Sequence, residues 1–159
     1  MTTKRPDLPP VFVAAIAICS TAVLLQAVTA GIFVNQDGRD SWVTVHGVIA
    51  DVTWVSALVA AVVGLLRVRR SRPVLAYGTS TLFVLTLAQT GIGHLITDKG
   101  MDGLIVVHVP LAVLIFGLAT FLVVALARAH QVLPPVLDPY VDEGTDHSAV
   151  EPFPVANRD

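Results

Sequence analysis

Two glutamine–histidine pairs repeat along the chain at nearly the same spacing. Gln26 precedes His46 by 20 residues, and Gln89 precedes His108 by 19. Each glutamine lies in the outgoing half of an apolar run, and each histidine lies just inside the next run. Neutral imidazoles are ligands of haem iron, and two of them facing each other inside a helical bundle can hold a haem. The pattern therefore suggests a haem b site with His46 and His108 as its axial pair.

Three further side chains belong to the candidate site. Gln26 and Gln89 are expected to bond across the bundle centre or to a bound ligand, because buried amides in lipid usually bond between helices. His94 is expected at the depth of the other two histidines, where it would bond a haem propionate or a quinone carbonyl. Alternatively, the three histidines at this depth would form a zinc site with help from Asp98 or Asp102, although zinc needs several ligands in tetrahedral arrangement and no closely spaced histidine motif is present.

Four apolar segments must position these residues. The chain has 159 residues, of which 54% are hydrophobic and 14% charged, and its mean hydropathy is +0.74. Each segment is close to the ~20 residues that a helix needs to cross a hydrocarbon core, and a backbone in lipid must satisfy its own hydrogen bonds. The sequence therefore predicts an all-α integral membrane bundle with spans at about 10–34, 43–66, 74–96 and 104–127.

Basic residues gather on one side of these segments. Two precede the first segment, four arginines separate the second from the third, and Arg128 closes the fourth. The positive-inside rule then places both termini in the cytoplasm. The short connections make consecutive helices antiparallel, which gives an up-down-up-down four-helix bundle. The matched pairs indicate that it is built from two repeated helical hairpins.

The remaining segments differ from the bundle in composition. Residues 1–9 form a polar cytoplasmic lead, and 10–128 form the four-transmembrane-helix domain. Residues 129–159 are rich in proline and acid, which predicts a disordered acidic cytoplasmic tail. These features point to a multi-pass protein of a bacterial plasma membrane that has the lipid bilayer as its surroundings and no nucleic-acid partner.

Asp51 is the only acid inside a predicted span. Ionisable residues at such depth are costly and are candidates for function by default. Asp51 lies five positions after His46, or about 140° round a helix, so the two do not share a face. We expect it to bond Gln26, Thr53 or Thr29 as a contact between helices, or to act as a proton-relay carboxyl in quinone chemistry.

Several stretches resemble one four-helix half of haem A synthase. They are Gln89-Thr-Gly-Ile-Gly, then Val107-His108-Val-Pro-Leu-Ala112 after a short loop, and Val45-His46-Gly running to Leu-Leu-Arg67. Parts of the chain are also similar to small uncharacterised four-helix bacterial membrane proteins. The resemblance, which spans 26–128, implies that His46 and His108 are the axial ligands of a b-type haem. The chain is half the length of a synthase and lacks the Glu and the cysteine pair in its first outer loop, so the resemblance does not extend to full synthase activity.

The sequence thus predicts a membrane b-type haem-binding protein for electron transfer or haem handling near the outer face. Its partners would be a quinone or a redox protein on the outer side, and a larger membrane complex or a homodimer. The alternative is a cofactor-free membrane accessory or assembly protein that acts through helix packing and its acidic tail. No nucleophile, acid–base pair or phosphate loop is evident in the sequence, so we do not predict an independent enzyme.

Overall fold

The computed structural model describes residues 7–35 and 39–130 of the chain. Within them lie four long helices: α1 (Pro10–Asn35), α2 (Arg39–Val63), α3 (Pro73–Lys99) and α4 (Ile105–His130). A π-helical turn, η1 (Gly64–Val68), continues α2, and a 3-10 turn, η2 (Asp102–Leu104), precedes α4. The described part of the chain is all-helical, and it contains four helices long and apolar enough to cross a membrane, as predicted.

The helices extend beyond the apolar runs from which they were predicted. The second begins at Arg39 rather than at 43, and the third ends at Lys99 rather than at 96. Local bonds support the added polar turn of α3, since Thr97 Oγ1 donates to the Gly93 carbonyl. Gly100 then closes α3 with φ 66°, a left-handed conformation that favours glycine. Most of the predicted lead and tail lies outside the described residues, although α4 continues to His130.

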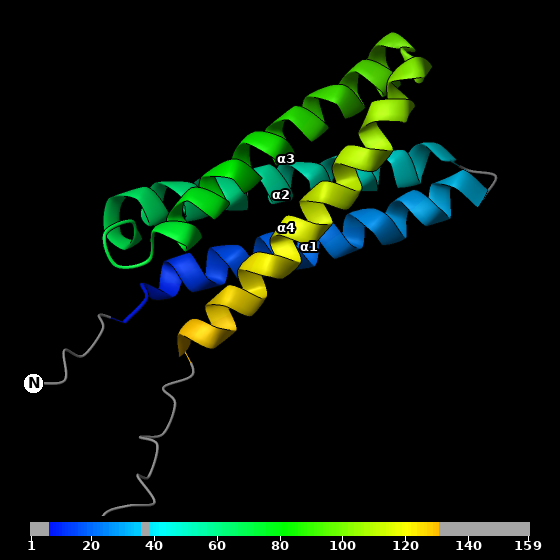
Figure 1. Cartoon of the computed structure of the whole chain (residues 1–159). Helices are drawn as coiled ribbons and strands as arrows, with labels where there is room; N and C mark the ends of the chain where they lie inside the picture. Colours follow the sequence, from blue (N-terminus) through cyan, green and yellow to red (C-terminus); the bar gives the residue numbers. More distant parts are fainter. Residues whose placement is uncertain (1–6, 36–38, 131–159) are drawn as a thin grey trace, which may run out of the picture.

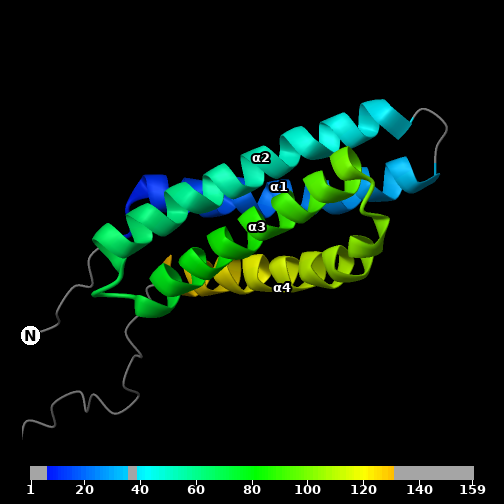
Figure 2. The ribbon, with the colours of Figure 1, turned by 90° about the horizontal axis from the view of Figure 1, so that it is seen from above.

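The four helices run alternately up and down (Figures 1 and 2). Each packs against two neighbours, in the cyclic order α1, α2, α3, α4, so that α2 and α4 lie diagonally opposite. We call the end that holds the α1–α2 and α3–α4 connections the hairpin end. The opposite end, where α1 begins and α4 finishes, is the terminal end. Figure 1 shows the tips of the two hairpins standing apart at the hairpin end.

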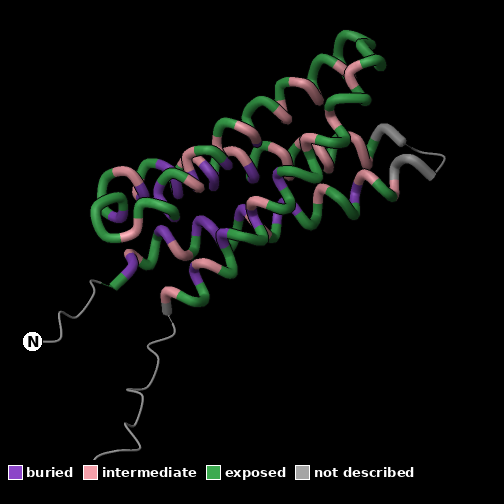
Figure 3. Tube along the Cα trace, in the orientation of Figure 1, coloured by how far each residue is buried: buried purple, intermediate pink, exposed green. Residues whose placement is uncertain are grey.

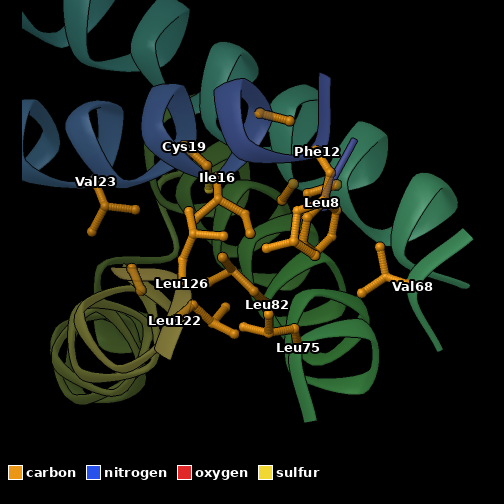
Figure 4. Packing of buried hydrophobic residues seen from close by; sticks show 14 of the residues in the cluster. Leu8, Phe12, Ile16, Cys19, Val23, Val68, Leu75, Leu82, Leu122 and Leu126 are labelled. Atoms are coloured by element: carbon orange, nitrogen blue, oxygen red, sulfur yellow. The ribbon is translucent and has the colours of Figure 1, made fainter. Parts of the chain in front are cut away.

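The hydrophobic core occupies the terminal half of the bundle (Figure 3). Phe12 and Ile16 of α1 are fully buried there, together with Leu82 of α3 and Leu122 of α4. Figure 4 shows these side chains meeting between the helices, with Leu75 and Leu126 beside them. Cys19 is a buried member of the same cluster. Leu8 joins it as well, so the end of the predicted polar lead packs into the core.

The hairpin half of the bundle lacks such a core. No residue of 41–52, 87–99 or 105–114 is buried, and among the described side chains of α1 Thr29 is the buried one nearest the hairpin end. Both histidines of the candidate site fall within these ranges. The fold therefore divides into a packed half that fixes the helices and a loosely packed half that carries the polar residues.

Candidate functional site

Both glutamines bond the histidine with which their spacing pairs them. Gln26 Nε2 of α1 donates to the main-chain carbonyl of His46 on α2 over 2.7 Å. Gln89 Nε2 of α3 donates to the carbonyl of His108 on α4 over 3.0 Å. The expected bond between helices is present in each hairpin, and its acceptor is a main-chain oxygen. The same contact thus sets the register of both hairpins.

Small residues leave these two carbonyl groups accessible. A side chain on a helix lies over the turn that precedes it, so the residue at i+4 covers the carbonyl of residue i. Ala50 occupies that position after His46, and Ala112 occupies it after His108. The repeated alanine therefore has a local explanation, because a long side chain there would obstruct the approach of the glutamine.

Thr29 orients the ring of His46. The Thr29 hydroxyl donates to the carbonyl of its own helix at Leu25, 3.0 Å away, and its oxygen lies 2.9 Å from His46 Nδ1. In the histidine tautomer that carries its proton on Nδ1, the Thr29 oxygen accepts from Nδ1–H. The lone pair of the imidazole is then on Nε2, the nitrogen that most often meets a metal. Thr29 follows Gln26 by one helical turn, and this spacing is the signal in the sequence that could have identified it as a neighbour of His46.

The second hairpin lacks this hydroxyl. Ile92 follows Gln89 by the same three residues, so His108 receives no equivalent bond. His108 Nδ1 and Gln89 Oε1 are both buried, and neither has a hydrogen-bond partner among the described residues. A buried polar atom without a partner costs about 1–3 kcal/mol, so such a pair marks a place where a bound group would be stabilising. A Cβ added at Gly93 would lie 3.5 Å from His108 Cε1, so glycine gives this ring room.

The two imidazoles share one region of the molecule. His46 lies five residues into the candidate span Ser41–Val68, and His108 lies six residues into the span Asp102–Ala129. Each histidine is thus roughly 8–9 Å along its helix from the end of the span that lies at the hairpin end of the bundle. Both side chains are half-buried, on diagonal helices, in the half of the bundle without a packed core.

The hydrogen bond and ion pair that His94 forms are with Asp98, not with His46 or His108. Its side chain is 61% exposed, and its Nδ1 lies 3.3 Å from Asp98 Oδ2 on the same helix. The described residues contain no group of three or more histidine, cysteine or acidic side chains that could hold a metal ion. The zinc alternative with Asp98 or Asp102 is therefore unsupported. A haem iron needs fewer protein ligands than zinc does, since the protein supplies only its axial ligands.

Asp51 bonds a residue that is not among its expected partners. Trp54 Nε1 donates to Asp51 Oδ1 over 3.0 Å, one turn along α2, and Asp51 is exposed. The expected bonds to Gln26, Thr53 or Thr29 were wrong, because Asp51 lies on the outward face of α2. Thr53 instead donates to the Ile49 carbonyl of its own helix over 2.8 Å.

The site therefore consists of two imidazoles on diagonally opposite helices, two amides that bond the main chains of these histidines and one hydroxyl beside the ring of His46. Two nitrogen donors without a thiolate or a carboxylate suit haem iron better than zinc. No protein-family model, curated protein or solved structure matches the chain.

Proposed function

We propose that this protein binds haem b between α2 and α4, with His46 and His108 as the axial ligands. The observation that carries the proposal is their placement: two histidines at similar depth, each with its main-chain carbonyl held by the same kind of glutamine bond, in the half of the bundle without a core. The unpartnered buried nitrogen of His108 fits a bound group at this position. The resemblance to one half of haem A synthase points the same way.

The proposal includes an orientation for the bundle. Arg67, Arg69 and Arg70 lie at the terminal end, together with Arg128. By the positive-inside rule this end and both termini face the cytoplasm, and the hairpin end faces out. We place the protein in a bacterial plasma membrane and regard its two hairpins as copies of one unit. The shared glutamine bond supports this duplication.

The residues have separate roles in the proposed site. A haem would supply one-electron redox chemistry or would itself be the cargo. His46 and His108 would hold it, and Thr29 would fix the ring of His46 by accepting from Nδ1. Gln26 and Gln89 would hold the main chains on which the two rings are mounted. Because both histidines lie near the outer boundary, a quinone headgroup or an external redox protein would be the electron partner.

The absorption spectrum of the purified protein tests this proposal. The protein would be expressed with ample haem, purified in detergent, and measured as reduced minus oxidised. We expect the sharp α band of a six-coordinate, low-spin haem. A featureless spectrum after reconstitution with added haem would exclude the cytochrome function.

One observation favours the alternative, a cofactor-free accessory or assembly protein. Both glutamines bond the main chain of the histidines and not their rings, so the repeated spacing serves helix packing even without a cofactor. In that case the protein would act through its helices and its acidic tail. The featureless spectrum described above is the result that this function predicts.

Thr29→Val is expected to weaken haem retention by about 10- to 100-fold, the usual cost of losing a hydrogen bond to a metal-ligating histidine. The change removes the oxygen that accepts from His46 Nδ1 and keeps the side-chain volume. Haem titration followed by absorbance measures the effect. Thr53→Val is the matched control, because both threonines are 5% exposed and the Thr53 hydroxyl bonds only its own helix. Equal haem affinity in the two variants would contradict a role for Thr29.

A further inference from the structure

Asp51 presents a carboxyl group to the membrane interior from the outside of the bundle. It lies ten residues into the 28-residue candidate span Ser41–Val68, or about 15 Å along the helix, near the middle of a hydrocarbon core. Its side chain is exposed, and Trp54 bonds one of its two oxygens. Carboxyl groups at this depth are costly in lipid and usually face protein. The outward position of Asp51 therefore calls for a protein surface that covers it.

The face of α2 around Asp51 has the pattern of a helix–helix interface. Val48, Val55 and Val62 recur every seven residues and are 44–59% exposed. Asp51 lies between the first two, three residues after one and four before the other. Apolar residues spaced alternately by three and four form the seam of a parallel helix pair, and β-branched residues in such a repeat favour two strands. A single polar residue in the seam fixes register and the number of chains.

We propose that α2 pairs with α2 of a second copy of this chain along the face formed by Val48, Asp51, Val55 and Val62. Copies inserted in one membrane have the same orientation, so two contacting α2 helices are parallel and related by a two-fold axis. Equivalent residues then meet at equal depth, and Asp51 faces Asp51. A carboxyl group that carries a proton is both donor and acceptor, so two identical groups are complementary to each other.

The second copy accounts for this face better than a different helix does. A different partner would have to present a donor at one depth and also match a regular row of valines. A second copy supplies both features from the same residues. The interface is independent of the proposed haem site, because Asp51 lies about 140° round the helix from His46.

Disulfide cross-linking in native membranes tests the interface. Val48→Cys and Val55→Cys would each be made in a Cys19→Ala background, so that no other thiol reacts. Mild oxidation is expected to produce covalent dimers from both variants. Val113→Cys is the control, because it is 66% exposed on α4 at a similar depth. Dimers formed as readily through position 113 as through position 55, or no dimers at 48 and 55, would overturn the proposal.

Substitution of Asp51 tests the carboxyl pair. Energy transfer between labelled copies, measured during dilution in detergent, gives the dimer dissociation constant. Asp51→Leu is expected to raise that constant by about 3- to 30-fold, the range for one hydrogen bond between helices in lipid. Asp51→Asn keeps a donor and an acceptor and is expected to remain within about threefold of the natural chain. An Asp51→Leu protein that dimerises as tightly as the natural chain, or an entirely monomeric natural chain, would overturn the proposal.

Discussion

His46→Ala and His108→Ala are each expected to remove the low-spin, six-coordinate haem spectrum. Each substitution takes away one axial ligand and leaves a single imidazole, so the remaining haem would be five-coordinate and weakly held. The haem affinity should fall by more than about 100-fold, which is the upper range for removing a group that only hydrogen-bonds a metal ligand. Absorbance titration with haem, in parallel with the reduced-minus-oxidised spectrum, measures both effects.

These variants should remove a haem ligand without disturbing the fold. The glutamines bond the main-chain carbonyls of His46 and His108, and alanine keeps those carbonyls. Helical content and thermal stability should therefore change little. His94→Ala is the matched control, because His94 lies at the same end of the bundle and its side chain is exposed. Retention of the spectrum in either His46→Ala or His108→Ala would contradict the axial assignment.

The sequence was sufficient to predict the helices because a membrane imposes both their length and their internal hydrogen bonding. Their ends were less predictable. Apolar runs mark the hydrocarbon boundary, and a helix can continue past it through polar residues with local bonds, as α3 does through Thr97 to Lys99. The short connections predict that consecutive helices are neighbours, and each consecutive pair of helices is in contact.

The candidate site was predictable in its spacing and less so in its contacts. Matched distances along the chain paired each glutamine with its histidine, but a sequence does not display main-chain carbonyls as acceptors. The orienting role of Thr29 was missed for a related reason, since it depends on the angle at which α1 faces α2. Asp51 is the clearest example of a contact that the sequence did not predict. Its expected partners lie inside the bundle, whereas its side chain is exposed and bonds Trp54 of the same helix.

The contrast between the two halves of the bundle rests on close packing at the terminal end, and Gly64 is closely surrounded there by three neighbouring residues. A Cβ at this position would lie 3.0 Å from Thr79 Oγ1, 3.1 Å from Phe12 Cε2 and 3.2 Å from the Cα of Ala76. Three helices therefore meet over a residue with no side chain. One of these contacts is main chain, which has no rotamer to change, so α3 itself would have to move to admit a larger residue.

Gly64→Leu is consequently expected to destabilise the bundle by about 1–3 kcal/mol or more, the usual cost of overpacking a filled core. Thermal unfolding in detergent, followed by circular dichroism, measures the loss. Gly117→Leu is the matched control, because a Cβ at Gly117 on α4 meets nothing within 4 Å. The effect should also reach the candidate site, since α3 carries Gln89 and a displaced helix would lengthen its bond to His108. Equal melting temperatures for the two leucine variants would show that the terminal half is not the part that holds the helices in place.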